Sequence, residues 1–372
     1  MGGIQRHSFN LVRHLARLGV DIDLYHTDFG GSEGIGDLAG IEEDLRPWIT
    51  SIPLAWPKRA RLPGHFVREL GLFSESIFAM MRTRGPVDLV YDQGMTAGAI
   101  VAARRHDLSL PPVLSSIHGF EMFQRADSPR TFLSNLLTKG AYGAHVRASD
   151  AVVSLGGRLT ELIHRKVRVP MDRIIELPNG IDSSWFSSPP EVPPTGTPVR
   201  FLFVGRYVRL KGIEELQRAI LMNPSWAGRA HFRFIGPIPE DKRLDLRHVS
   251  YAGAIHDEER LREEYRMCDV LLCPSHSEGM PTVILEAMAT GMAVIASDVG
   301  ATNTMVSATN GILLPRSTPQ TIAAAVERML ALADAELMAM KRSSLENVQA
   351  FRWDQVAAKT LEAMQTVVQD CR

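Results

Sequence analysis

The sequence predicts an α/β protein made of two doubly wound domains, each built on a mainly parallel sheet. Its 372 residues exceed the roughly 150 that one domain usually holds. Short apolar runs of strand length alternate with helical stretches, which is typical of parallel sheets with crossover helices. Near the middle, Ser187–Pro198 holds five prolines and almost nothing apolar, so it is expected to be a linker between the domains.

The composition limits the class of protein and of partner. Hydrophobic residues make up 45% and charged residues 22% of the chain, as in soluble globular proteins. The net charge of −1 gives no global attraction to nucleic acid, so none is expected as a partner. Three cysteines are too few for a disulfide framework and fit a reducing, cytoplasmic setting. No cluster of histidines and cysteines predicts a metal site.

The first domain is predicted over residues 1–186. It begins with a helix at about Ser8–Leu18 and a strand at Val20–His26. Further strands are expected at Val87–Tyr91, Val113–Ile117 and Ala151–Leu155, with helices at Met95–Arg105 and Pro129–Ala148. A doubly wound domain normally has a central strand before its first glycine turn, but here a helix follows Met1-Gly2-Gly3 directly. We therefore expect the first strand to be missing and the true start to lie upstream.

The second domain is predicted over residues 199–350, after the linker at 187–198. Its strands are expected at Arg200–Val204, His231–Ile235, Val270–Cys273 and Ala293–Ser297, and its helices at Ile213–Leu221, Thr282–Ala289 and Gln320–Leu332. Two such domains leave a cleft between them, and ligands of this fold class bind at the carboxyl ends of the strands. Candidate site residues are therefore sought directly after predicted strands.

The motif with the most chemical content runs from Ser275 to Glu286. Pro281 suits the first position of the following helix, where its missing N–H costs nothing. Unpaired amides and the helix dipole make such an N-terminus a phosphate site, for which the backbone of Gly279, Met280, Pro281 and Thr282 would serve. Glu286 lies in an otherwise apolar helix and needs hydrogen-bond donors, which sugar hydroxyls supply. Glu278, in the loop, could bind a second set of hydroxyls; the alternative is a capping loop with one buried salt bridge.

Two further motifs lie at strand ends. Gly205 permits a turn after the first strand of the second domain, and Arg206 and Lys211 follow on the loop, where two cations can neutralise a diphosphate. The alternative is a solvated loop with surface charges. In the first domain, His118 ends a strand and is followed by Gly119, a position that favours an active-site histidine over a structural one.

Residues 56–84 combine basic and apolar residues at helical spacing. Lys58, Arg59, Arg61, Arg68, Arg82 and Arg84 face only Glu69 and Glu75, with Phe66, Leu70, Phe73, Ile77 and Met81 between them. Such a segment could contact anionic lipid or a phosphorylated acceptor. The alternative, slightly favoured, is an ordinary amphipathic helix with its apolar face in the core.

Together these motifs resemble the retaining glycosyltransferases of family four, the glycosyl transferases of group 1. The resemblance covers nearly the whole chain and includes motifs at Gly2-Gly3, His118-Gly119, Pro178–Asp182, Gly205-Arg206, Lys211-Gly212 and Phe351–Asp354. Glu278 and Glu286 have the family's E-x7-E spacing. The resemblance implies the GT-B fold, with two Rossmann-like domains and a C-terminal helix at 351–372 that returns to the first domain.

The resemblance also implies the reaction. It is the transfer of a hexose-type sugar from a nucleotide-diphosphate sugar, UDP- or GDP-linked, to a saccharide or lipid-linked acceptor, with retention of configuration and without a metal ion or permanent cofactor. Arg206 and Lys211 would bind the diphosphate, Glu286 the ribose and Glu278 the donor sugar, with His118 beside the reacting carbon. Gly3 would belong to a loop that contacts donor phosphate and acceptor. Apart from the resemblance, the protein is expected in the cytoplasm, and residues 56–84 are the candidate segment for any peripheral contact with an anionic membrane. The alternative is a noncatalytic or truncated GT-B module that acts as a binding partner.

Overall fold

The computed structural model describes residues 3–28, 38, 40–58, 64–124, 129–186 and 192–371. The chain forms two compact units. The first unit comprises Met1–Asn179 together with Trp353–Arg372, and the second comprises Gly180–Arg352. All the strand pairs within the described sheets are parallel, so the predicted α/β class is confirmed.

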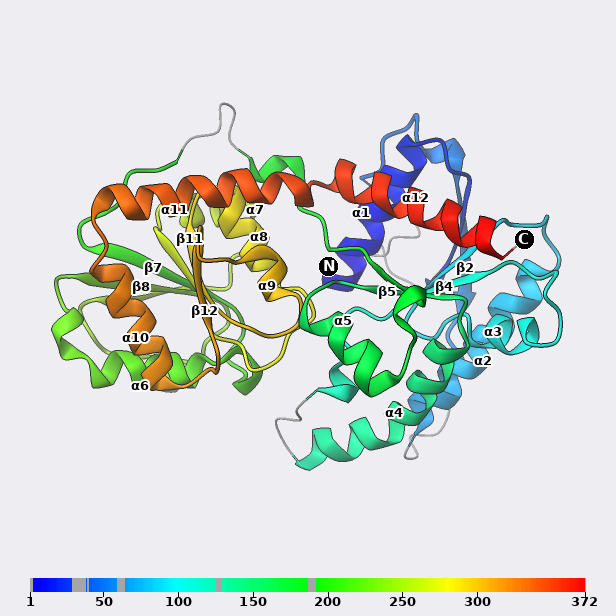
Figure 1. Ribbon diagram of the computed structural model, residues 1–372, viewed down its shortest axis with the longest axis horizontal. Helices are drawn as coiled ribbons and strands as arrows, with labels where there is room; N and C mark the ends of the chain where they lie inside the picture. The colour runs from blue at the N-terminus through cyan, green and yellow to red at the C-terminus, as the bar shows by residue number, and fades with distance from the viewer. Residues whose placement is uncertain are drawn as a thin grey trace. The chain divides into compact units, whose positions relative to one another are not determined.

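The second unit is built on one six-stranded sheet, shown in Figure 1. Its strands are β7 (Val199–Val204), β8 (Ala230–Ile235), β9 (Val249–Gly253), β10 (Val270–Cys273), β11 (Ala293–Ser297) and β12 (Gly311–Leu314), in the order β12-β11-β10-β7-β8-β9. From β7 the chain proceeds outward to β9, then returns to the other side of β7 and proceeds to β12. The strand order therefore reverses between β7 and β10, the position where folds of this class bind ligands.

Helices cover both faces of this sheet. They are α6 (Ile213–Met222), α7 (Glu258–Arg266), α8 (Thr282–Ala289), α9 (Thr302–Met305), α10 (Pro319–Leu330) and α11 (Asp334–Asn347). In Figure 1, α6 and α10 lie together on one face, and α8 lies beside α11 on the other. The core under α6 includes Phe201 and Phe232, whose stacked rings are 5.2 Å apart.

The first unit carries two sheets. Strands β1 (Ile22–Asp28) and β2 (Ile49–Ala55) form one, and β3 (Val90–Gln93), β4 (Val113–Ser116), β5 (Ala151–Ser154) and β6 (Ile174–Glu176) form the other in sequence order. The first described element is the helix α1 (Gly3–Arg17). Among the described residues no strand precedes it, and none joins β1 to β3.

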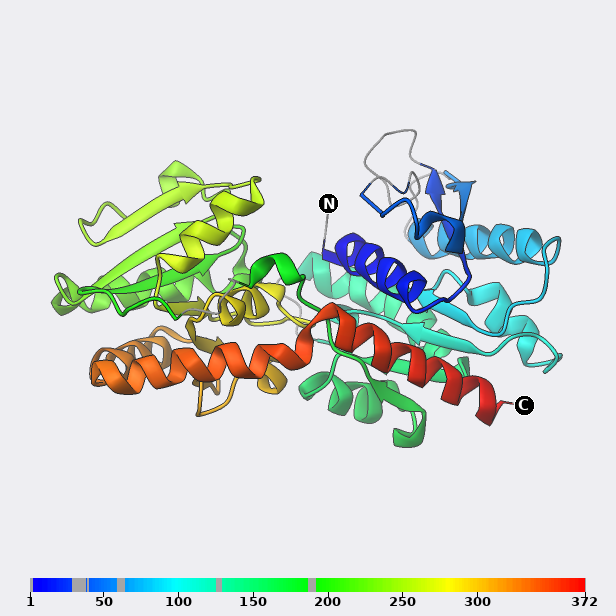
Figure 2. The ribbon, with the colours of Figure 1, turned by 90° about the horizontal axis from the view of Figure 1, so that it is seen from above.

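Helices cover the four-stranded sheet on both faces, because neighbouring residues of a strand point to opposite sides. Val113 packs with α2 (His65–Met81) and α3 (Gly98–Arg104), while Leu114 packs with α12 (Trp353–Asp370). Figure 2 shows α12 running beside α1. The remaining helices of this unit are α4 (Pro129–Ala148) and α5 (Arg158–Leu162).

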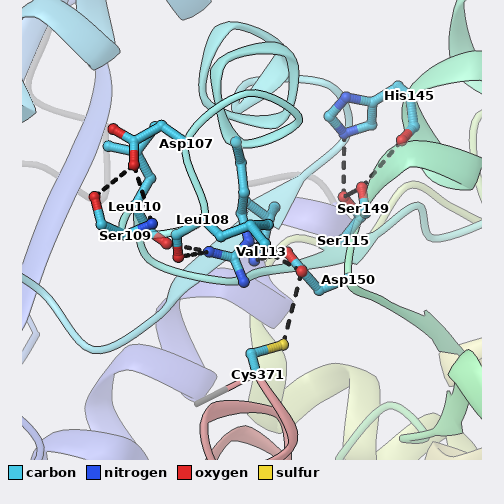
Figure 3. Close-up of polar contacts among 11 residues, drawn as sticks. Asp107, Leu108, Ser109, Leu110, Val113, Ser115, His145, Ser149, Asp150 and Cys371 are labelled. Atoms are coloured by element: carbon cyan, nitrogen blue, oxygen red, sulfur yellow. Dashed lines mark hydrogen bonds and ion pairs between the residues drawn. The ribbon is translucent and has the colours of Figure 1, made fainter.

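The residue after α12, Cys371, contacts Asp150 through its thiol, as Figure 3 shows. Arg104 Nε on α3 lies 2.8 Å from Asp150 Oδ2, which also accepts the Val113 amide of β4 at 2.8 Å. Cys371 Sγ, directly after α12, donates to Asp150 Oδ1 at 3.7 Å. One carboxylate thus links α3, β4 and the end of the returning helix.

Several predicted elements have the predicted bounds, namely Pro129–Ala148, Val270–Cys273, Thr282–Ala289 and Ala293–Ser297. The strand expected at Val87–Tyr91 is displaced to Val90–Gln93. The sequence analysis missed β2, which contains Pro53. A proline is tolerated there because β2 pairs only with β1 among the described strands, and an edge strand can lack one amide donor. Of the predicted linker 187–198, residues 187–191 lie outside the described part.

Candidate functional site

The two strongest sequence motifs meet at the strand-order reversal of the second unit. The loop after β7 carries Lys211, and the loop after β10 carries Glu278. The His276 amide of the second loop donates to the Leu210 carbonyl of the first at 2.8 Å. Gly212 has φ +67, and a Cβ there would lie 1.9 Å from the Pro274 carbonyl oxygen, so only glycine fits this contact.

A salt bridge joins these loops. Lys211 Nζ donates to Glu278 Oε1 at 2.7 Å, and Ser275 Oγ donates to the same oxygen at 2.7 Å. Burial alone would lower the pKa of Lys211, but the carboxylate of Glu278 outweighs it and the pKa is raised. The ammonium therefore stays charged, and its position is set before any ligand arrives. Arg206, on the same loop, is exposed.

Two further glycines, which were not predicted from the sequence, contact the backbone of these loops. Each follows a neighbouring strand of the sheet. At Gly236, after β8, φ is +137 and a Cβ would lie 2.0 Å from the carbonyl oxygen of Gly205. At Gly300, after β11, φ is +56 and a Cβ would lie 2.2 Å from the carbonyl oxygen of Gly279. That oxygen also accepts the Ala301 amide at 2.7 Å. The only available signal was a glycine shortly after a predicted strand.

Helix α8 presents its N-terminus on the same loop. Pro281 was expected at the first helical position, but the helix begins at Thr282 and Pro281 is the residue before it, with φ −71 and ψ 111. The N-cap residue Pro281 makes no side-chain capping hydrogen bond in the described part of the chain, and the first amides of a helix lack partners within the helix. Met280 and Pro281 are buried, and Thr282 is half-buried. Unpaired amides and the helix dipole favour negative charge at such an end.

Glu286 is buried on α8, with 6% of its surface exposed. Its Oε2 accepts a 2.6 Å hydrogen bond from the hydroxyl of Tyr265 on α7. Burial and then Glu286 raise the pKa of Tyr265 well above its ordinary value, so the phenol remains a donor. Trp185 packs edge-on against Tyr265, with ring centroids 5.3 Å apart. Sugar hydroxyls were expected to donate hydrogen bonds to Glu286. The structure shows that the hydroxyl of Tyr265 is one donor to this carboxylate.

The candidate residue of the first unit is His118, directly after β4. Its ring packs edge-on against His7 of α1, with ring centroids 4.6 Å apart and planes at 79°. Burial lowers the pKa of His118 to about 4. Phe120 is fully buried with φ +50, a conformation that costs free energy in a non-glycine residue and occurs often at functional sites. His7 was missed because it lies before the helix expected at about Ser8–Leu18, whereas α1 begins at Gly3.

Gly119 separates His118 from this strained residue. A Cβ at Gly119 would lie 1.9 Å from the Glu121 carboxylate, and Gln124 Nε2 donates to the Gly119 carbonyl at 2.6 Å. A side chain at position 119 would therefore require the flexible carboxylate of Glu121 to move.

The helix within residues 56–84 buries its apolar side, which was one candidate for contact with lipid. Leu70, Phe73, Ile77 and Met81 of α2 are buried, and only Phe66 among the apolar residues quoted for this segment is exposed. The structure therefore agrees with an ordinary amphipathic helix. Arg59 and Arg61 lie outside the described residues. None of the helices in the described part of the chain is both long and apolar enough to span a membrane.

Two other predictions concern places where little is described. Gly3 begins α1, whereas Gly2 lies outside the described residues. Within the described ranges, no group of three or more histidine, cysteine, aspartate or glutamate side chains is arranged to hold a metal ion. Cys268 and Cys273 are buried, and burial raises the pKa of each thiol to about 12.

Each half of the chain matches a family of known glycosyltransferases. Residues 1–185 match the model of Glycosyltransferase Family 4, and residues 198–332 match that of Glycosyl transferases group 1. A D-inositol 3-phosphate glycosyltransferase of Kineococcus radiotolerans is 30% identical over 232 residues, which is 53% of each chain. The alignment thus spans about half the length of that relative.

Solved structures show the same fold. Sucrose-phosphate synthase from Thermosynechococcus elongatus superposes with a TM-score of 0.76 at 23% identity, over 99% of this chain and 94% of that one. Anabaena HepE, in complex with UDP and glucose, gives 0.68 at 14% identity, over 98% and 96%. With both units matched, the chain belongs to the family-four, group 1 glycosyltransferases and has the GT-B fold.

Proposed function

We propose that this protein transfers a hexose-type sugar from a UDP- or GDP-sugar to a saccharide or lipid-linked acceptor, with retention of configuration and without a metal ion. One observation carries the proposal: the Lys211–Glu278 salt bridge of 2.7 Å lies at the strand-order reversal of the second unit. A fixed cation at that position suits a diphosphate, and a carboxylate beside it suits sugar hydroxyls.

Each donor group has a matching residue in this proposal. Lys211, Arg206 and the amides at the start of α8 bind the diphosphate, with the backbone of Gly205 and Gly279 close to it. Glu286, oriented by Tyr265, accepts hydrogen bonds from the ribose, and Glu278 positions the sugar. The HepE structures with UDP, UDP-glucose and glucose support a nucleotide-sugar donor, although each relative acts on its own substrate.

The chemistry requires the bond between sugar and diphosphate to ionise. Positive charge then develops on the sugar and negative charge on the leaving phosphate. Lys211 and the α8 amides stabilise the leaving group without reorganising, because their positions are already fixed. His118 lies beside the reacting carbon and Gly3 near the donor phosphate and acceptor. Residues 56–84 carry no lipid contact in this proposal, since the apolar side of α2 is buried.

The first experiment is a thermal-shift titration with UDP, GDP, ADP and UDP-glucose. A diphosphate at 100 times its Kd stabilises the folded protein by about 2.7 kcal/mol. We expect one of them to raise the Tm of the wild type, and Lys211→Ala and Glu286→Gln each to weaken its binding at least tenfold. Lys242→Ala, which removes an exposed lysine of the same unit, is the matched control and should bind normally.

Two outcomes contradict the proposal. If no nucleotide raises the Tm of the wild type, the noncatalytic alternative is favoured. If Lys211→Ala and Glu286→Gln bind the nucleotide as tightly as Lys242→Ala, the donor site lies elsewhere.

A further inference from the structure

We infer that His7 is a positioning residue for His118: the edge of one imidazole against the face of the other fixes the orientation of the ring that lies beside the reacting sugar. The inference rests on the proposed function, because it assigns His7 a part in the same reaction. The contact joins α1 to the loop after β4.

The His118 ring has little else to orient it. Its Nε2 is buried and has no hydrogen-bond partner among the described residues. A histidine without a polar partner for that nitrogen can turn about its side-chain bonds unless a packed neighbour prevents it. The ring of His7, 4.6 Å away at 79°, is such a neighbour. Phe120, two residues after His118, holds the backbone in a left-handed conformation, so the loop itself is constrained.

His7 is in turn fixed from its other side. It is 8% exposed, and the indole of Trp353, the first residue of α12, packs against it with centroids 5.2 Å apart at 64°. His14, two helical turns further along α1, stacks on the same indole at 6.3 Å and 24°. The two histidines of α1 thus share Trp353, but only His7 contacts His118.

Both touching rings are uncharged near neutral pH. Burial first, and then the neighbouring His118, lower the pKa of His7 to about 3. Burial lowers the pKa of His118 to about 4. Two neutral rings can stay in edge-to-face contact without charge repulsion. Protonation of both rings would add charge repulsion between them, and the lowered pKa values of His7 and His118 prevent this near neutral pH.

The test compares His7→Ala with His14→Ala, since both remove a ring that packs on Trp353. Turnover is measured as UDP release from UDP-glucose in the absence of acceptor, or GDP release from GDP-mannose if only GDP binds. We expect His7→Ala to lower kcat about tenfold with little change in the KM for the donor, and His14→Ala to leave both near wild type. His7→Phe, which keeps an aromatic ring, should restore most of kcat.

A double-mutant cycle separates a positioning role from a structural one. If His7 acts through His118, adding His7→Ala to His118→Ala lowers kcat no further. Additive losses would overturn the inference, as would normal kcat in His7→Ala. If His7→Ala does not fold, His7→Gln takes its place with the same expected results. A His118→Ala variant with normal turnover would contradict the proposed function itself.

An NMR titration gives a readout that needs no turnover. In His7→Ala, water reaches the space beside His118, and we expect the pKa of His118 to rise by at least one unit toward its ordinary value. In His14→Ala it should stay as in the wild type. An unchanged pKa in His7→Ala would mean that the ring of His7 does not enclose His118, and the inference would fail.

Discussion

The two units prepare their candidate residues in opposite ways. In the second unit, charges are placed and paired: Lys211 meets Glu278 at 2.7 Å, and Glu286 accepts the phenol of Tyr265 at 2.6 Å. In the first unit, His118 is a half-buried neutral ring that packs against a second neutral ring, that of His7. Within one GT-B fold, the candidate residues of the second unit are thus held by fixed ions and those of the first by packing, although both sets follow parallel strands.

This contrast matches the demands of the proposed reaction. A departing diphosphate needs charges that are already oriented, because reorienting them during the reaction would add to the barrier. Beside a sugar carbon that becomes positive, a second positive charge would be repulsive. A histidine kept neutral avoids that repulsion.

The largest expected effect concerns the backbone that supports the ionic site. In Gly300→Ala, the new Cβ would lie 2.2 Å from the Gly279 carbonyl oxygen and 2.4 Å from that of Glu278. We expect the free energy of unfolding to fall by about 3 kcal/mol, and nucleotide binding to weaken as the loop moves. Urea unfolding and a nucleotide titration measure the two effects.

Gly228→Ala is the control for Gly300→Ala. Gly228 has φ +84 but no atom within 4 Å of its Cβ position, so the substitution adds backbone strain of about 1–2 kcal/mol without a clash. Nucleotide binding should be unchanged. Equal losses in the two variants would show that the close approach at Gly300 does not support the ionic site.

An intermediate effect tests the neutral site through pH. Unfolded histidines bind a proton below about pH 6.5, whereas His7 and His118 remain neutral down to about 3 and 4. The unfolded state therefore binds more protons between these values, and stability falls as the pH falls. From pH 7 to pH 5 the loss is about 2 kcal/mol per histidine.

Urea unfolding at the two pH values checks this expectation. In His7→Phe the loss of stability between pH 7 and pH 5 should be smaller than in the wild type by about 2 kcal/mol. His106→Phe, which changes an exposed histidine of the same unit, is the control and should lose as much as the wild type. An equal loss in all three proteins would mean that His7 is protonated in the folded state.

The smallest effect concerns a single hydrogen bond of the ionic site. Tyr265→Phe removes the donor to Glu286 and should cost about 1.5 kcal/mol of stability and weaken nucleotide binding. Tyr251→Phe is the matched control in the same unit, because its hydroxyl accepts the Leu244 amide at 2.8 Å. If both variants bind the nucleotide equally well, Tyr265 does not orient Glu286 for the ligand.

The same contrast explains what could be predicted from the sequence. In the second unit, uninterrupted apolar strands and a helix start after Pro281 identify both the sheet and the loops at its carboxyl edge. The contact between Lys211 and Glu278 was not predicted, because it depends on the order of the strands in the sheet. Tyr265 was not predictable, because its hydroxyl reaches Glu286 from α7, 21 residues away in sequence.

The first unit was harder to predict for a physical reason. Its β2 contains a proline and alternates irregularly, so its pairing with β1 is a tertiary property rather than a local one. His7 shows the same limit. Its contact with His118 joins residues far apart in sequence through helix packing, and no spacing rule along the chain signals it.

The composition of the first unit also bears on how the protein is made. Residues 353–372 belong to it, yet they follow all of the second unit in the sequence. The ribosome must therefore synthesise the whole of Gly180–Arg352 before α12 can cover Leu114, Val153 and the neighbouring apolar side chains of the four-stranded sheet. Until α12 has been synthesised, this apolar surface stays exposed to solvent, and exposed apolar surface of this kind is what chaperones bind.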